Sequence, residues 1–202
     1  MPIMGHILTG RPTWEYQEVL LVIDMQNDFC LPDAVLCVKG AMACLPAVIA
    51  AVELARRKAV EIIWVIREHD PSGIDVELFR EPMFRLGRSS TVRGTPGAEL
   101  VAGLAVRPGE RIVIKRRFSA FFDTELDRVC RRMGVGRVTP NCIRGTAWDA
   151  IALDYPQVTV LSDATASSTD EVQQANLYDL RAVSVDTPTV AEWAAQLGDV
   201  HD

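Results

Sequence analysis

Short apolar runs alternate with longer amphipathic stretches along this chain. Five runs are apolar almost throughout, as expected for strands buried on both faces of a parallel sheet. They are residues 18–23 (EVLLVI), 60–66 (VEIIWVI), 111–114 (RIVI), 157–161 (QVTVL) and 182–185 (AVSV). Helices are predicted over residues 41–58, 124–133, 142–153, 170–180 and 189–197. This alternation predicts a three-layer α/β/α, doubly wound fold with a mostly parallel sheet.

One long irregular stretch interrupts the alternation. Residues 67–97 are rich in Gly, Pro, Arg and Ser and show no strand or helix periodicity. Loops of this length inside a compact domain usually serve a function. We therefore consider this stretch a candidate lid or partner-facing surface.

Composition indicates an ordinary globular protein. The chain has 202 residues, of which 49% are hydrophobic and 24% charged, and we expect one domain over residues 1–202 with its core at about 18–197. A net charge of −6 argues against non-specific binding to nucleic acid or to an anionic membrane. The first residues lack the pattern of a secretory signal, so we expect a cytoplasmic location, with organellar targeting left open.

The cysteines do not suggest a disulfide framework. There are five, at positions 30, 37, 44, 130 and 142, an odd number with irregular spacing. Most are expected to be small buried hydrophobic residues.

Ligands of open α/β sheets bind at the carboxyl ends of the strands, and this rule selects a few polar residues. Asp24 ends the first strand; its carboxylate could be a general base or could cap the next turn. Lys115 ends the third strand, where a lysine is ordinarily a solvated charge. Residues 67–70 and the TPNC segment occupy two further strand ends.

Cys142 is the most informative residue. It follows Thr139-Pro140-Asn141 and begins a predicted helix, where free amide N–H groups lower the pKa of a thiol and can hold an oxyanion. A buried cysteine on the core face of that helix is the alternative. With Asp24 as proton acceptor and Lys115 as charge stabiliser, the thiolate could attack a carbonyl carbon, and water would hydrolyse the acyl-enzyme.

Several motifs in order resemble the isochorismatase-like cysteine hydrolase family. They are LLVIDMQNDF, REHDPSGIDVELFR, GTPGAEL, IKRRFSAFFDTELD, TPNCIRGTAWDAIALDYPQVTVLSDATA and EVQQANLYDL. The resemblance is greatest to the plant nicotinamidase-like branch, whose members are often regarded as inactive on nicotinamide. It implies a catalytic triad of Asp24, Lys115 and Cys142, with the backbone N–H groups of Val138 and Cys142 as oxyanion hole.

The resemblance also implies a small-molecule substrate and a homo-oligomer, with no nucleic-acid or membrane partner. The candidate substrate-binding residues are Phe29, Arg67, His69, Phe122, Thr139 and Asn141. For Phe29 and Phe122, core packing is the alternative role.

The metal site of true nicotinamidases is not expected here. Those enzymes resemble one another in an Asp-x-His motif after the second strand, where this chain has Arg67-Glu68-His69. The other two histidines, His6 and His201, lie near the termini, so a three-histidine site cannot be assembled. We therefore predict no metal and no cofactor.

The strand before the nucleophile departs from the family. Relative to the family, about six residues are absent between the helix ending near Met133 and Thr139, so this central strand is expected to be shortened or missing. Either residues 130–135 leave the helix to form the strand, which would bury Arg131 or Arg132, or the sheet has a gap.

Three functions remain open from the sequence. The first is metal-independent hydrolysis of a small amide or carbamoyl C–N bond through a Cys142 thioester. The second is a catalytically inactive relative or truncated isoform that acts as a binding or interaction protein. The third is hydrolysis of an isochorismate-type vinyl ether without a covalent step.

Overall fold

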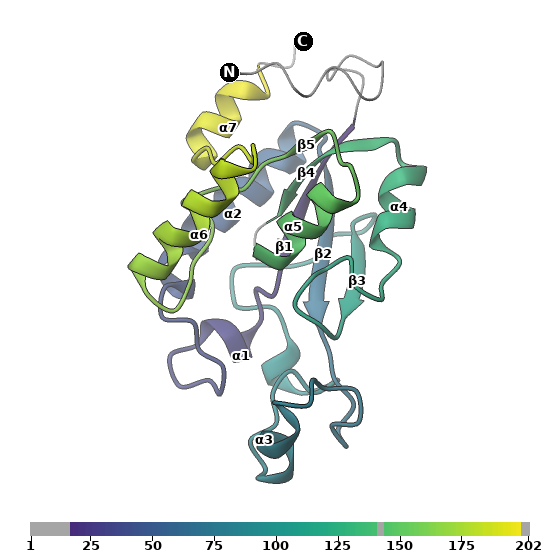
Figure 1. The fold of residues 1–202 in the computed structure, drawn as a ribbon, viewed down its shortest axis with the longest axis vertical. Coiled ribbons are helices and arrows are strands. Elements are labelled where there is room, and N and C mark those ends of the chain that lie inside the picture. Colours follow the sequence, from purple (N-terminus) through teal and green to yellow (C-terminus); the bar gives the residue numbers. More distant parts are fainter. Residues whose placement is uncertain (1–16, 141–143, 199–202) are drawn as a thin grey trace.

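A parallel sheet of five strands forms the centre of the computed structural model, which describes residues 17–140 and 144–198. The strands are β1 (Gln17–Ile23), β2 (Glu61–Arg67), β3 (Arg111–Lys115), β4 (Val135–Pro140) and β5 (Gln157–Val158), in the order β3-β2-β1-β4-β5. The helices are α1 (Asn27–Cys30), α2 (Ala41–Arg57), α3 (Glu81–Arg85), η2 (Pro96–Ala98), α4 (Leu126–Arg132), α5 (Arg144–Ala152), α6 (Asp170–Ala182) and α7 (Val190–Gln196). The predicted three-layer α/β/α fold is confirmed (Figure 1).

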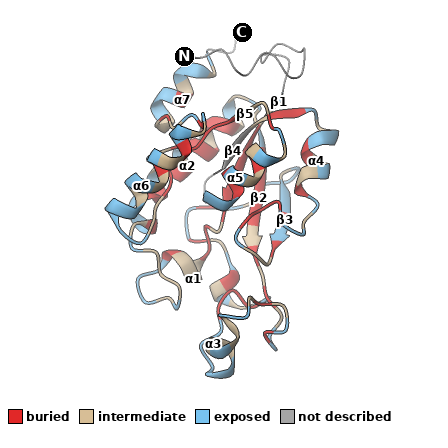
Figure 2. Cartoon of the chain, in the orientation of Figure 1, coloured by how far each residue is buried: buried red, intermediate tan, exposed pale blue. Residues whose placement is uncertain are grey.

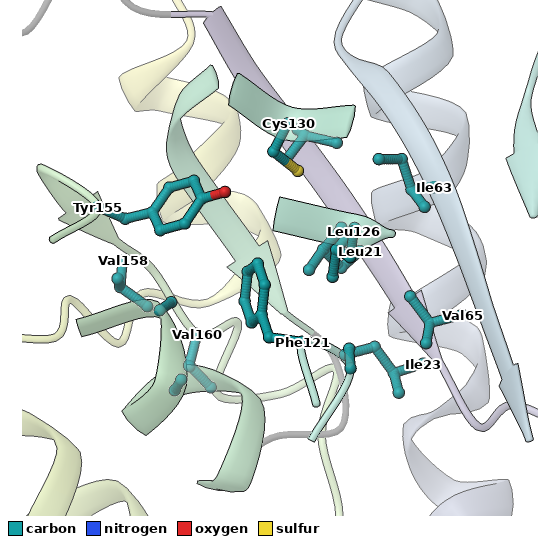
Figure 3. Packing of buried hydrophobic residues seen from close by; sticks show 14 of the residues in the cluster. Leu21, Ile23, Ile63, Val65, Phe121, Leu126, Cys130, Tyr155, Val158 and Val160 are labelled. Atoms are coloured by element: carbon teal, nitrogen blue, oxygen red, sulfur yellow. The ribbon is translucent and has the colours of Figure 1, made fainter. Parts of the chain in front are cut away.

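Both faces of the sheet are covered, which explains the continuous apolar strands. In β1, Leu21 and Ile23 belong to a core cluster with buried side chains of α4, α5 and α6. Leu20 and Val22 belong to a second cluster with buried side chains of α2 and with Trp193 of α7. Figure 2 shows the resulting burial of the central strands, and Figure 3 shows the first cluster around Leu21 and Ile23. Burial on both faces requires an apolar residue at each successive position.

The strand before the nucleophile is present, so both alternatives predicted for it are wrong. Helix α4 continues to Arg132, and β4 forms from the next residues, beginning at Val135. It pairs with β1 on one side and with β5 on the other. A register shift opposite Gln17 and Glu18 marks a bulge at Gly136. The residues directly before Thr139 thus lie within the strand itself.

The charges that this region was expected to bury remain accessible. Arg131 and Arg132 are exposed on α4. Arg137 lies in β4 directly opposite Glu18 of β1, and its guanidinium lies 4.0 Å from the Glu18 carboxylate. The carboxylate offsets the cost of placing an arginine in a central strand.

One predicted strand is wrong. Residues 182–185 do not extend the sheet, because Ala182 is the last residue of α6 and residues 183–184 form a turn. The next residue, Asp186, pairs with Thr159 in an isolated parallel bridge, in which its N–H donates to the Val158 carbonyl and its carbonyl accepts from Val160 N–H. Short apolar runs fit a helix end as well as a strand, which explains the error.

The long irregular stretch lies beyond the carboxyl ends of β2 and β3. It begins with the last residue of β2, contains the short helix α3 and the start of η2, and has one bridge between His69 and Val92. The rest consists of turns and irregular backbone. Figure 1 shows α3 projecting away from the sheet at this end. Within residues 17–140 and 144–198, none of the helices has the length and apolar character that crossing a bilayer requires.

Candidate active site

Asp24 and Lys115 form an ion pair at the carboxyl end of the sheet. The Lys115 Nζ lies 2.7 Å from Asp24 Oδ2, and the side chains are 1% and 11% exposed. Lys115 Nζ also donates to the backbone carbonyls of Arg117 at 3.1 Å and Phe118 at 3.2 Å. The ammonium group therefore has three acceptors, which matches its three donors and offsets the cost of its burial.

The backbone of Asp24 turns sharply as it leaves β1. Its φ of 55° lies in the left-handed region, which aspartate tolerates better than most residues. The Asp24 N–H donates to the Val65 carbonyl of β2 at 2.9 Å, and the Asp24 carbonyl accepts from Gln26 N–H at 2.8 Å. Strained backbone of this kind is common where a side chain must be aimed at a site.

Gln26 fixes the segment after Asp24, a role that the sequence analysis missed. Its side chain is fully buried and accepts from the Arg67 N–H at 2.8 Å. Its amide donates to the carbonyls of Arg67 at 2.8 Å and Ala98 at 2.7 Å. Gln26 thus links the ends of β1 and β2 to η2. A glutamine directly after an apolar strand was the only sequence signal for it.

Two arginines and a glutamate lie beside this ion pair. Arg67 ends β2 in register with Lys115 and is only 2% exposed. Its Nη1 lies 3.0 Å from Glu77 Oε1, and Arg80 Nε lies 3.1 Å from the other oxygen, Glu77 Oε2. Burial and the nearby Arg67 charge lower the pKa of Arg80. Neither Glu77 nor Arg80 was a sequence candidate, since both come from the irregular stretch.

Aromatic rings cover the two guanidinium groups. The Arg67 Cζ lies 5.5 Å and the Arg80 Cζ 5.7 Å from the centre of the Phe118 ring. Phe118 in turn stacks on Phe79, with ring centres 6.1 Å apart and planes nearly parallel. Such contacts favour a cation over the ring face and help to hold both arginines in place.

These residues line a cavity of about 180 Å³. Its lining includes Asp24, Arg67, Arg80, Phe118 and Phe29, with mostly apolar side chains of β1, α1 and α2 completing it. The volume is below the roughly 300–1,000 Å³ of pockets for drug-sized ligands, so the cavity suits a small molecule.

Two other sequence candidates, His69 and Phe122, lie outside the cavity lining. His69 is buried outside its lining, with Nδ1 3.2 Å from Asp75 Oδ1 and the ring edge-on to Phe84. Burial and the Arg67 charge lower the pKa of His69, which favours the neutral ring at pH 7. Phe122 is 59% exposed and also lies outside the lining.

The residues expected to carry the nucleophile are only partly described. Cys142 and Asn141 lie outside the described residues. Thr139 is opposite Leu20 in β4, and Val138 is inside the same strand, paired with Val19 and Val158. The expected oxyanion role of Val138 would require an N–H that is free of the strand ladder.

Three of the four cysteines that the structure describes differ from a reactive thiol. Burial raises the pKa of Cys30 to about 12, and those of Cys44 and Cys130 to about 11, well above the ordinary value of a thiol. Like charges would add to this effect for Cys30, because Cys44 and Asp24 are nearby. These three thiols are therefore protonated near neutral pH. Cys37 is half-buried.

The residues present do not fit a divalent metal. A buried guanidinium, that of Arg67, occupies the position at which the resemblance places the first ligand, and a second cation, Arg80, lies beside it. His69, which follows Arg67 by two residues, directs Nδ1 at Asp75. Within the described parts of the chain, His, Cys, Asp and Glu side chains form no group of three or more that could hold a metal ion.

Comparison with known proteins assigns this site to a family. The Isochorismatase domain model matches residues 18–192. The chain belongs to the isochorismatase family. It is 48% identical over 186 residues to a probable inactive nicotinamidase of Arabidopsis thaliana, covering 88% of this chain and 95% of that protein.

Two further proteins are similar over most of their length. The crystal structure of an isochorismatase family protein from Desulfovibrio vulgaris matches with a TM-score of 0.86 and 42% identity, over 91% of this chain and 100% of that one. The ureidoacrylate amidohydrolase RutB of Azorhizobium caulinodans is 28% identical over 202 residues, covering 88% of each chain. The relatives of this isochorismatase-family chain thus include nicotinamidases and amidohydrolases.

Proposed function

We propose that this isochorismatase-family protein is a cysteine hydrolase that cleaves a small amide or carbamoyl C–N bond through a thioester on Cys142, without a metal. The main support is the Asp24–Lys115 ion pair, 2.7 Å long and buried against a small cavity at the carboxyl end of the sheet. The position of Cys142, three residues after Thr139 at the end of a central strand, favours the same site. An amidohydrolase among the relatives agrees with this choice of bond.

In the proposed reaction, Asp24 accepts the proton of the Cys142 thiol and the sulfur attacks the carbonyl carbon. The backbone N–H of Cys142 holds the oxyanion. The C–N bond then breaks, and the amine leaves with the proton that Asp24 returns. Water attacks the thioester while Asp24 takes its proton, the C–S bond breaks to release the carboxylic acid, and Asp24 reprotonates the sulfur. Lys115 offsets the negative charge on Asp24 and on the sulfur throughout.

The proposal predicts that Cys142→Ala removes all turnover. Ammonia release is measured with a panel of small amides and ureido compounds, because the nucleophile is required whichever of them is the substrate. Cys37→Ala, at a half-buried cysteine, is the matched control and is expected to keep full activity. Hydrolysis that survives Cys142→Ala would contradict the thioester mechanism.

Nicotinamide is not the substrate that we propose. The relative from Arabidopsis thaliana is named a probable inactive nicotinamidase, and Arg67 stands in place of the metal-ligand aspartate. The same name favours a second candidate function, that of a non-catalytic binding protein on this scaffold. An unreactive Cys142 thiol would support that second function.

A further inference from the structure

We propose that Arg67 and Arg80 form an anion-binding subsite, so that the substrate is a small amide carrying a carboxylate or a similar negative group. This inference deepens the proposed function and rests on it for the bond that is cleaved. The subsite itself is argued from the arginines, their shared carboxylate and the cavity that they line.

The first argument is charge. The cavity lining and its direct ion-pair partners contain three cations, Arg67, Arg80 and Lys115, and two carboxylates, Asp24 and Glu77. This leaves one net positive charge in a protein whose own net charge is −6. Buried charges are costly unless they are paired, so a substrate anion would complete the balance.

The second argument is unused hydrogen-bonding capacity. Arg67 is 2% exposed, and its contact with Glu77 goes through Nη1 alone. Its Nε is buried without a hydrogen-bond partner among the described residues. Guanidinium groups bind carboxylates through two parallel N–H groups, so the remaining donors of Arg67 are suited to a ligand in the cavity.

The third argument is preorganisation. Glu77 forms ion pairs with both guanidinium groups, since Arg67 Nη1 contacts both of its oxygens and Arg80 Nε lies 3.1 Å from Oε2. The Phe118 ring lies within 6 Å of both groups. The arginines are therefore fixed before a ligand arrives, which lowers the entropic cost of binding. Since Asp24 lines the same cavity, an anion held there would place the amide group of a short substrate near Asp24.

Size restricts the substrate further. About 180 Å³ corresponds to roughly six water volumes, which matches the size of a short amido acid. We therefore choose as probes oxamate, malonamate, succinamate and glutaramate. Each is compared with its diamide, which has the same length and shape without the charge.

The test separates binding from hydrolysis. Binding of each probe to the Cys142→Ala protein is measured by calorimetry, and ammonia release is measured with the unaltered protein. We expect at least one amido acid to bind and react about 10- to 100-fold better than its diamide. Arg80→Met should remove this preference, whereas Arg85→Met, at an exposed arginine of α3, should preserve it. Arg80 is chosen over the more deeply buried Arg67, whose loss endangers folding.

The outcomes distinguish this inference from the proposed function. Hydrolysis of the diamides as fast as of the amido acids would overturn the subsite and leave the proposed hydrolase activity intact. The same holds if Arg80→Met reduces hydrolysis of amido acids and diamides equally. Selective binding of an amido acid without turnover supports the subsite and overturns the hydrolase. Failure of all four amido acids to bind the Cys142→Ala protein overturns the subsite.

Discussion

Lys115→Met is expected to abolish turnover and to lower the free energy of unfolding by about 3–5 kcal/mol. Methionine fills much of the volume of the lysine stem but removes the cationic partner of the buried Asp24 carboxylate. The carbonyls of Arg117 and Phe118 also lose their Lys115 donor. Urea denaturation followed by circular dichroism measures the loss of stability, and ammonia release measures the loss of activity.

A double variant separates the two effects. In Asp24→Asn/Lys115→Met the uncompensated carboxylate is gone, so part of the lost stability should return, by about 1 kcal/mol or more, while activity stays absent. If Lys115→Met has the same free energy of unfolding as the unaltered protein, the Asp24 carboxylate does not depend on Lys115 for its stability in the fold, which would contradict the account of a buried ion pair.

Asp24→Asn is expected to reduce kcat/KM by about 10²- to 10⁴-fold, the range typical of losing a general base. Asparagine keeps the shape of the side chain and tolerates the left-handed backbone at φ 55°, so the change acts on the proton acceptor rather than on the turn. The effect is read from initial rates on the best amide of the panel.

Asp123→Asn is the matched control for this substitution. Asp123 has nearly the same backbone conformation, φ 54°, but its side chain is exposed and lies outside the cavity. It should leave kcat/KM unchanged. A loss of less than about fivefold in Asp24→Asn would contradict a general-base role for Asp24.

The sheet and the placement of Asp24 and Lys115 at its carboxyl edge could be predicted because simple rules apply to them. Continuous apolar runs identify strands that are buried on both faces, and parallel strands bring their carboxyl ends to one edge. Asp24 and Lys115 end β1 and β3 on either side of β2, and their side chains meet there. No spacing in the sequence specifies this contact, but the topology does.

The anionic and cationic residues of the irregular stretch could not be predicted. Glu77 and Arg80 have no strand or helix periodicity that fixes where they lie, and only the folded loop brings them to Arg67. For His69, its place after β2 suggested the cavity, whereas the structure places its side chain against Asp75 and outside the lining.

The central strand was misjudged for a related reason. A comparison of lengths indicated a deficit before Thr139, yet the chain compensates by drawing Gly136 and Arg137 into β4. A glycine bulge and the facing Glu18 make this local solution acceptable. Sequence periodicity does not reveal such compensation, because it depends on the charge of the neighbouring strand.

The central claim is that Cys142 is an activated thiol beside Asp24 and Lys115. The most direct test is the rate at which iodoacetamide labels each cysteine of the folded protein as a function of pH, with the labelled sites resolved by mass spectrometry. Cys30, Cys44 and Cys130 serve as internal standards, since burial raises their pKa values to about 11–12. We predict that Cys142 is labelled fastest, with an apparent pKa below the ordinary value of about 8.5. Labelling of Cys142 no faster than that of the other cysteines, or only after unfolding, would contradict an assembled catalytic site.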